Sequence, residues 1–524
     1  MTADGDPDVV VVGGGHNGLA AAAYLARAGL HVVVVEARAT FGGAVASERI
    51  FPGVDASLSR FSYLVSLLPQ QLVDDLDLDL TLRSRAVASY TPTMDGRGLL
   101  VARPEAEATR ASFRALTGSH SEYERWRELH RRLGDFARVV APTLTEPLPR
   151  AADLRGQLDA TLWSALVEHP LAELLEQTFA DDTVRGMVLT DGLIGLLASA
   201  DDPTLRQNRC FAYHVIGNGT GEWRVPVGGM GVVAAALEGS ARRAGAELRS
   251  SLAAERLLPD ERGGGTVVLA DGTRITARYV LAGCAPGFLD QLLGRPAGAG
   301  PEGSQTKVNI VLRRLPRLRS GLAPEVAFAG TLHLGQGYRR LQKAFEQASG
   351  GELPDPMPCE VYCHTLTDPS ILGPELQQTG CHTLTVFGLH TPARLFVDDH
   401  DRMRERAKQA ALRALQSVLD EPLEDCLLRD QDGHPCVEVM TPLDIAAELR
   451  MPGCHIFHGD LDWPWLHEGE AAETAAQRWG VSTDLDGVLL CGSGSRRGGA
   501  VSGIGGHNAA HAVLEAERGG PRGA

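Results

Sequence analysis

The chain has 524 residues, of which 44% are hydrophobic and 22% charged, and its formal net charge is −16. This length exceeds one compact core, so we expect two domains. An acidic surface repels phosphate backbones and argues against a nucleic-acid partner. No apolar run approaches the roughly 20 residues of a membrane helix, and no signal-like segment flanks the first strand. We therefore expect no transmembrane segment and a cytoplasmic location.

The first predicted unit, residues 8–36, reads as a strand, a glycine turn, an Ala-rich helix and a second strand. Its turn, residues 13–18, has the sequence GGGHNG and matches G-x-G-x-x-G. A continuous apolar run precedes the turn and a helix follows it, which is the context of a Rossmann-type βαβ unit. The alternative is a glycine-rich turn that binds no ligand.

Each residue type in this turn has a physical role. Gly13 permits the tight turn, Gly15 lets a pyrophosphate approach the helix N-terminus, and Gly18 lets the helix pack closely on the strand. Asn17 joins them as a candidate cofactor ligand. Glu36, at the end of the second strand, can accept hydrogen bonds from ribose hydroxyls and would repel a 2′-phosphate.

The next segment, residues 36–43, has the form E-x-R-x-x-x-G-G. Here the sequence resembles the large family of amine oxidases, phytoene desaturases and carotenoid isomerases. The resemblance implies FAD as the cofactor, with Gly42 and Gly43 against its diphosphate and ribityl region. Arg38 takes a supporting role, and Ala37 belongs to the same candidate site. A simple loop is the alternative for the glycine pair.

The resemblance continues along the chain. Residues 51–64 are similar to the segment that follows the glycine pair in phytoene desaturase-related proteins, and residues 225–231, VPVGGMG, are similar to their central motif. The strand after that motif meets the adenine end in relatives, which implies a cofactor contact at Ala254. Residues 100–210 between these motifs look largely helical, and residues 232–244 form a helix that Gly245 ends.

Lys307 is one of only three lysines and lies in an apolar strand, residues 307–312. A lysine at the matching place in amine oxidases holds a water near flavin N5, which makes Lys307 a catalytic candidate. A buried lysine requires a polar partner. The alternative is a strand-end lysine that reaches solvent.

Nine cysteines are scattered without a C-x-x-C pair, which argues against a dithiol relay. Cys359, Cys363 and His364 could suggest a metal site. A strand over residues 360–364 with buried thiols explains them more simply, because zinc sites usually contain tighter pairs. We expect no metal.

Residues 455–465, HIFHGDLDWPW, are dense in polar and aromatic groups. Loops of this composition often carry function. His458 or Asp460 could accept a proton from a substrate there. A packed aromatic loop with solvated acids is an equally good interpretation.

The last unit is a strand over residues 487–491, a Gly-rich turn and a C-terminal helix. In the family that the sequence resembles, this turn meets the ribityl chain and pyrophosphate. The positive end of the helix would also stabilise charge on a reduced flavin. Arg496-Arg497 stands where relatives often have His-Pro, which puts the local shape in question. The implied cofactor residues are Gly492, Ser493, Val501, Ser502, Gly503 and Ile504.

These observations predict an α/β fold: a Rossmann-type FAD-binding domain joined to a mixed α+β substrate domain. The FAD-binding domain is expected to be discontinuous, and helix 402–419 belongs to the substrate domain. The expected FAD-binding segments are 1–95, 215–300 and 480–518, and the expected substrate-domain segments are 96–214 and 301–479.

The resemblance identifies a phytoene desaturase-related FAD-dependent oxidoreductase that dehydrogenates an apolar or amphipathic small molecule by hydride transfer to flavin N5. Three alternatives remain: a flavin amine oxidase that uses oxygen, a redox-neutral flavin isomerase, and a non-catalytic binding protein such as the Rab GDP-dissociation inhibitors, which lack the C-terminal motif. A homodimer is compatible with the sequence.

Overall fold

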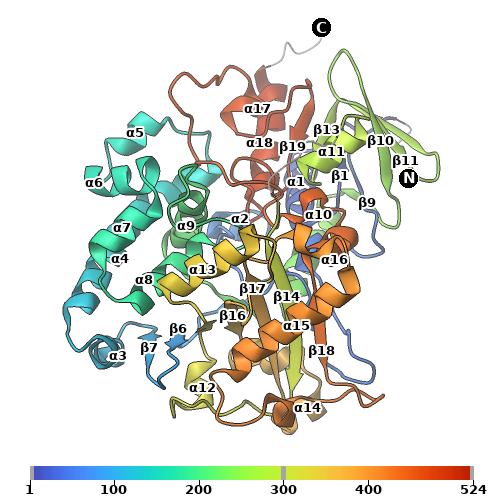
Figure 1. Ribbon diagram of the computed structural model, residues 1–524. Helices are drawn as coiled ribbons and strands as arrows, with labels where there is room; N and C mark the ends of the chain where they lie inside the picture. The colour runs from blue at the N-terminus through green and yellow to red at the C-terminus, as the bar shows by residue number, and fades with distance from the viewer. Residues whose placement is uncertain (1–4, 297–301, 520–524) are drawn as a thin grey trace.

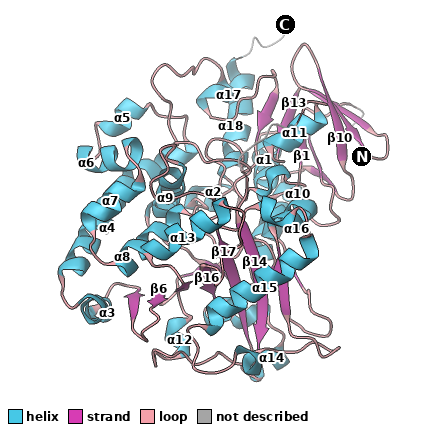
Figure 2. Ribbon diagram, in the orientation of Figure 1, coloured by secondary structure: helices cyan, strands magenta, loops and turns pink. Residues whose placement is uncertain are grey.

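A computed structural model describes residues 5–296 and 302–519, which form two large β-sheets flanked by helices (Figures 1 and 2). The first sheet is parallel and has the order β19-β13-β1-β2-β9. Its valine-rich strands are buried on both faces, as parallel sheets require. The strand bounds are β1 (Val9–Val12), β2 (Val32–Val35), β9 (Glu247–Arg249), β13 (Tyr279–Ala282) and β19 (Val488–Leu490).

Successive residues of β1 face opposite sides of this sheet, and each side has its own cover. Val9 and Val11 pack in a core with α1 (His16–Arg27), α10 (Met230–Arg243) and α18 (Ile504–Gly519). Val10 and Val12 pack against a three-stranded sheet and α11 on the other side. That cover consists of β10 (Ala254–Pro259), β11 (Gly265–Leu269), β12 (Arg274–Ala277) and α11 (Pro286–Leu292).

The second sheet has seven strands in the order β18-β14-β17-β16-β15-β6-β7, antiparallel except for the β15–β6 pair. Val308, Ile310 and Leu312 of β14 join a core with α15 (His400–Gln416), which crosses these strands in Figure 2. The strand bounds are β6 (Val87–Pro92), β7 (Gly98–Ala102), β14 (Gln305–Leu312), β15 (Thr331–Leu334), β16 (Cys359–Tyr362), β17 (His382–Leu389) and β18 (Val437–Met440).

A helical lobe, on the left of Figure 1, is inserted between β7 and β8. Its aromatic and leucine side chains form one core. Its helices are α3 (Glu107–Thr117), α4 (Ser121–Val140), α5 (Ala151–Arg155), α6 (Ala160–Trp163), α7 (Leu171–Thr178), α8 (Asp182–Leu189) and α9 (Arg206–Ile216). The smaller elements are β3 (Ser47–Glu48), β4 (Leu58–Ser59), α2 (Gln70–Asp75), β5 (Leu82–Arg83), β8 (Val225–Pro226), α12 (Pro324–Ala327), α13 (Tyr338–Ser349), α14 (Pro374–Gln378), α16 (Pro442–Leu449) and α17 (Ala475–Arg478).

The structure confirms the predicted βαβ unit, the helices α10 and α15, and the strands β14 and β19. The strand β6 lies inside the segment predicted for the FAD-binding domain, yet it pairs with β15 in the seven-stranded sheet. The chain therefore enters the seven-stranded sheet at residue 87, eight residues before the predicted end of the FAD-binding segment at residue 95. The predicted boundary between residues 300 and 301 lies outside the described residues. Within the described ranges, no helix is both long and apolar enough to span a bilayer.

Candidate active site

A large cavity lies where the carboxyl ends of β1, β2 and β13 meet the first residue of β14. It encloses about 1670 Å³, including its open mouth. The chain leaves β1 toward β2 on one side and returns to β13 on the other, so this edge is the switch point of the parallel sheet. Ligands of open α/β sheets bind at such points.

The turn after β1 allows a ligand to approach the backbone closely. Gly13 has a φ of +103°, and a Cβ there would lie 3.3 Å from the carbonyl carbon of Gly283. A Cβ on Gly15 would meet no described atom within 4 Å, because this position opens on the cavity. No described side chain caps α1, so its first N–H groups can bind an anion. At Gly18 a Cβ would lie 2.2 Å from the Gly13 oxygen, so Gly18 serves helix packing.

The Glu36 carboxylate is fixed by backbone at the end of β2. Its Oε2 accepts from the N–H of Gly14 and its Oε1 from the N–H of Arg38, both at 2.8 Å. Each oxygen retains a second lone pair. Glu36 also lines the cavity, together with Ala37 and Ala254. This end of the cavity can therefore bind ribose hydroxyls.

The second glycine pair, Gly42-Gly43, lies close to α10 and to the glycine turn after β1. Gly42 has a φ of +113°, and a Cβ there would lie 2.6 Å from the Cβ of Ala234 on α10. Gly43 lines the cavity, and its Cβ would lie 3.2 Å from the Cα of Gly15. Side chains at either position would push α10 or the glycine turn away.

The C-terminal glycine-rich turn closes the cavity beside α1. Ser493 and Val501 line it, and the Asn17 amide donates to the Ser493 hydroxyl at 3.4 Å. Ala500 has a φ of +61°, and its carbonyl oxygen lies 3.2 Å from Nε2 of His16. A left-handed alanine is strained, and such strain clusters at ligand sites.

The predicted cofactor residues thus fall into two groups. Gly492 packs on backbone, where a Cβ would lie 2.6 Å from the Gly283 oxygen, and Ser502 is fully buried and accepts from the N–H of Ile504 at 3.2 Å. Those that line the cavity are Gly13, Gly15, Asn17, Glu36, Ala37, Arg38, Gly43, Ala254, Ser493 and Val501. Those that pack around it are Gly18, Gly42, Gly492, Ser502, Gly503 and Ile504.

The two arginines that replace His-Pro tie this turn to its surroundings. Arg497 is 1% exposed and donates to the carbonyls of Glu146 and Trp479 at 2.5 and 3.0 Å. Burial lowers the pKa of Arg497 to about 9. Arg496 forms an ion pair with Asp462 at 2.7 Å. Arg497 therefore fixes the turn to the backbone around Glu146 and Trp479 and does not line the cavity.

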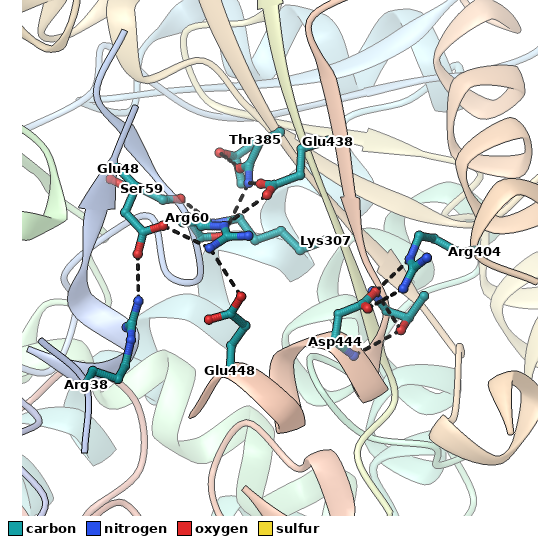
Figure 3. A network of polar contacts seen from close by, with 12 residues as sticks. Arg38, Glu48, Ser59, Arg60, Lys307, Thr385, Arg404, Glu438, Asp444 and Glu448 are labelled. Atoms are coloured by element: carbon teal, nitrogen blue, oxygen red, sulfur yellow. Dashed lines mark hydrogen bonds and ion pairs between the residues drawn. The ribbon is translucent and has the colours of Figure 1, made fainter. Parts of the chain in front are cut away.

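Lys307 is buried, and its polar partners are backbone atoms. Its Nζ donates to the carbonyl of Ser59 at 2.5 Å (Figure 3) and to the carbonyl of Ser62 at 3.0 Å. It also lies 5.2 Å from the ring centroid of Phe387. Burial holds the pKa of Lys307 well below its usual range. The cavity reaches Gln305, two residues earlier on the same face of β14, but Lys307 does not line it. Lys307 supports the cavity wall from behind, and its predicted role toward the flavin is still a prediction.

The two other catalytic candidates face different sides. His458 lines the cavity, and no described group is a partner for its Nδ1. Burial, then the nearby His16 and His455, lower the pKa of His458 to about 4. Asp460 lies outside the cavity, 3.6 Å from Arg206 and 3.7 Å from His455. The geometry therefore keeps His458 in reach of a ligand and turns Asp460 away.

The far end of the cavity holds groups that the sequence did not indicate. The ring centroid of Tyr63 lies 4.3 Å from that of Phe387 and 6.2 Å from that of Trp223, on which it stacks. The Trp223 ring stacks in turn on His214, with the centroids 5.0 Å apart. Gln305 is 2% exposed and lines the cavity, and neither atom of its amide has a partner among the described residues. Tyr63 belongs to the family-like segment 51–64. No local pattern marks Gln305, because its position depends on the register of β14.

A polar network joins the glycine-pair turn to the large sheet (Figure 3). Arg60 pairs with Glu48 and Glu438, both at 2.9 Å, and Glu48 also pairs with Arg38 at 2.8 Å. Asn309 of β14 donates to Glu438 at 2.9 Å. These contacts fix the segment that carries Tyr63 relative to both sheets.

Comparison with known proteins agrees with this geometry. The family model of an NAD(P)-binding Rossmann-like domain matches residues 11–72. An uncharacterized protein of Mycobacterium tuberculosis is 47% identical over 98% of this chain and 97% of its own. The rat pyridine nucleotide-disulfide oxidoreductase domain-containing protein 2 is 30% identical over 97% and 93%. Hydroxyneurosporene desaturase of Cereibacter sphaeroides is 29% identical over 59% and 62%.

Solved structures share the fold at low sequence identity. Cyclohexylamine oxidase of Brevibacterium oxydans has a TM-score of 0.57 and 18% identity over 98% of this chain and 100% of its own. An oxidoreductase of Methanosarcina mazei has a TM-score of 0.58 and 14% identity over 97% and 99%. The glycine turn and the matching Rossmann-like family model indicate a flavin or pyridine nucleotide as the cofactor. The chain belongs to the family of pyridine nucleotide-disulfide oxidoreductase domain-containing protein 2, among flavin-type oxidoreductases related to desaturases and sharing the fold of amine oxidases.

Proposed function

We propose that this protein binds FAD and uses it to dehydrogenate an apolar or amphipathic small molecule. The observation that carries the proposal is the continuity of one cavity. A glycine cradle and a fixed carboxylate, Glu36, line one end, and the aromatic rings of Tyr63, Trp223 and Phe387 line the other. A dinucleotide laid along the first end would leave the aromatic end for a substrate.

The residues present fit FAD. Gly15 and Gly43 leave space for a pyrophosphate beside the start of α1, Glu36 can bind the adenosine ribose, and Asn17 and Ser493 supply polar groups between them. Bound FAD supplies an acceptor for a hydride. The protein has to orient the substrate, exclude water and accept a proton.

The aromatic end favours a substrate without a permanent charge. Tyr63, Trp223 and Phe387 give it apolar walls that exclude water. Gln305 offers an NH₂ group with two donors and a carbonyl oxygen, and no described group uses either. A carbonyl, hydroxyl or amide on an otherwise apolar molecule would satisfy that amide, whereas a buried ion would need an opposite charge. The likeness to a desaturase supports the same substrate class.

Dehydrogenation also releases a proton, so an acceptor must reach the cavity. His458 is one of the two acceptors that the sequence predicts, beside Asp460, and its Nδ1 is open to a ligand. Its pKa of about 4 makes it a weak base, because an effective base has a pKa near the working pH. His458 can hold a substrate by a hydrogen bond more readily than it can keep a proton.

The test is anaerobic reduction of the FAD-loaded protein by a panel of neutral terpenoids, fatty alcohols and amines, followed as loss of visible flavin absorbance. We expect reduction by a neutral amphipathic compound. Reduction by amines alone, with one hydrogen peroxide formed per flavin on admitting air, would show an amine oxidase. Product formation by pre-reduced protein without net flavin oxidation would show an isomerase.

A variant of Gln305 tests the substrate end separately. Gln305→Leu should raise KM at least about tenfold with unchanged FAD content, because a bound polar group loses its partner. Gln342→Leu on the outer face of α13 is the matched control. If both variants keep the wild-type KM, Gln305 does not bind the substrate.

A further inference from the structure

A chain of hydroxyl groups leads from the cavity wall into the large sheet. Tyr63 lines the cavity, and its hydroxyl donates to the hydroxyl of Tyr362 at 3.0 Å. The Tyr362 hydroxyl donates to Oε2 of Glu360 at 2.6 Å. The other carboxylate oxygen accepts from Thr190 at 3.2 Å. Each hydroxyl in this series therefore donates in the direction of the Glu360 carboxylate.

Glu360 is an unusual residue for the middle of a sheet. It is 1% exposed on β16, and among the described residues it forms no ion pair. Burial raises the pKa of Glu360 to about 7, and burial together with Glu360 raises the pKa of Asp191 to about 7. The titratable and charged groups around Glu360 are Tyr362, Tyr63, Arg85, Asp191, Cys210, Cys359 and, opposite it on β15, His333.

Arg85 does not neutralise this carboxyl by direct contact. Its guanidinium carbon lies 5.6 Å from the centroid of the Tyr362 ring, and its Nη1 donates to Thr331 at 3.2 Å. A buried carboxyl without a paired cation destabilises a fold. Packing alone would be served as well by glutamine, which has the same shape. Buried titratable groups linked to a cavity are typical of functional sites.

We propose that Tyr63, Tyr362 and Glu360 form a relay that carries a proton between the substrate and the buried carboxylate. This inference rests on the proposed dehydrogenation, which removes a hydride and a proton from the substrate. FAD, when bound, would supply the acceptor for the hydride, and the proton goes to the Tyr63 oxygen. As that O–H bond forms, the original Tyr63 proton passes to Tyr362 and the original Tyr362 proton passes to Glu360.

The net change is one proton gained by Glu360 and one lost by the substrate, while both tyrosines end as neutral hydroxyls. After the product leaves, the same chain run in reverse returns the proton to water in the cavity. Tyr63 is the catalytic residue of the relay, and Tyr362 and Glu360 act through it. The relay accepts a proton when Glu360 is ionised, which requires a pH above its pKa of about 7.

The first experiment uses the full chain without added ligand. Infrared titration should show carboxylic acid C=O absorption that disappears near pH 7, to which both Glu360 and Asp191 contribute. Glu360→Gln should remove the part due to Glu360, whose midpoint is the quantity compared among the variants. Tyr362→Phe should raise the midpoint of this titration, because the carboxylate loses a hydrogen bond, and Tyr63→Phe should raise it by less. The control is Tyr338→Phe, since Tyr338 donates to Glu176 at 2.8 Å away from the cavity. A midpoint that Tyr63→Phe leaves unchanged overturns the relay.

The second experiment uses FAD-loaded protein and flash photoreduction with EDTA as the electron donor, with proton uptake followed by an indicator dye. Negative charge on a reduced flavin would raise the pKa of Glu360, and the relay would then deliver a proton to it from water in the cavity. At about pH 8 the ionised Glu360 should therefore add to the uptake per FAD, and at about pH 6, where it is already protonated, it should not. Glu360→Gln should abolish this difference. Tyr63→Phe should keep its size but slow it at least about tenfold.

Failure of the relay and failure of the proposed function give different results. If the protein takes up FAD and a substrate reduces it, but proton uptake at both pH values and its rate are the same in all variants, the relay is wrong and the dehydrogenase stands. If the protein takes up no FAD, the proposed function fails, and the infrared midpoints still decide whether Tyr63 is coupled to Glu360.

Discussion

Replacing Lys307 by methionine tests the structural role of this residue most sharply. Methionine has a similar length and no donor, so the carbonyls of Ser59 and Ser62 lose their shared partner. Each buried acceptor left without a hydrogen bond costs about 1–3 kcal/mol. Removing a buried amine offsets part of this cost. We therefore expect Lys307→Met to lower the free energy of unfolding by about 2–4 kcal/mol.

The segment that carries Ser62 and Tyr63 also loses its hydrogen bonds to Lys307 and should become less well ordered. Because this segment lines the cavity, FAD affinity should fall together with stability. The assay is the midpoint of thermal unfolding by tryptophan fluorescence, measured beside fluorescence titration with FAD. Lys343→Met on the exposed face of α13 is the matched control and should change stability by no more than about 0.5 kcal/mol.

Equal thermal unfolding midpoints for Lys307→Met and Lys343→Met would show that Lys307 does not stabilise the fold through these hydrogen bonds. The resemblance to amine oxidases makes a different prediction for the same variant: unchanged flavin content with markedly slower reoxidation of the reduced flavin by oxygen. Stopped-flow reoxidation after photoreduction measures that rate without a known substrate. The two roles for Lys307 are therefore separable in one variant.

Three further changes follow from the geometry. Gly15→Ala should abolish FAD binding and keep the unfolding midpoint, whereas Gly18→Ala, whose Cβ would lie 2.2 Å from a backbone oxygen, should lower both; equal behaviour of the two would refute the cradle. Glu36→Ala should weaken FAD binding at least about tenfold in a fluorescence titration, and unchanged affinity would exclude its contact with the ribose. Glu360 has its pKa raised to about 7 in the folded state, against about 4.3 when unfolded, so the folded protein binds an extra proton between these values and loses about 1.4 kcal/mol of stability per pH unit as the pH rises. Glu360→Gln should remove the part of the slope that Glu360 contributes in urea unfolding, while Asp191, whose pKa is also raised to about 7, keeps its own contribution. An unaltered slope would show that Glu360 does not titrate there.

The nucleotide-binding half of the fold could be predicted from the sequence because its signals are local. Four consecutive valines in each of β1 and β2 require burial on both faces, and the glycine spacing defines the turn between strand and helix. The strand β6 could not be assigned in this way. A short strand is compatible with either sheet, and β6 joins the second one through a partner, β15, more than 200 residues away.

The positions of the side chains at the aromatic end of the cavity could not be predicted from the sequence, because they depend on strand register and backbone direction and not on a motif. The cavity ends at Gln305, so Lys307, one pleat further along β14, reaches backbone instead. His458 and Asp460 diverge because His458 has a φ of +62° and Gly459 a φ of +153°, which reverses the chain between them.

The same limit applies to the hydroxyl chain. Tyr63 and Tyr362 are 299 residues apart in the sequence and meet only in the fold, where the segment after β4 contacts β16. The sequence marks the segment that contains Tyr63 but not its partner. Long-range pairs of this kind become visible only in the folded molecule.

The binding of FAD is the central claim, and equilibrium titration of the purified protein with FAD, in the presence of excess NAD, tests it most directly. We predict one FAD per chain, visible flavin absorbance that remains with the protein through gel filtration, and no displacement by NAD. Uptake of NAD without FAD, or no uptake of either, would contradict the account.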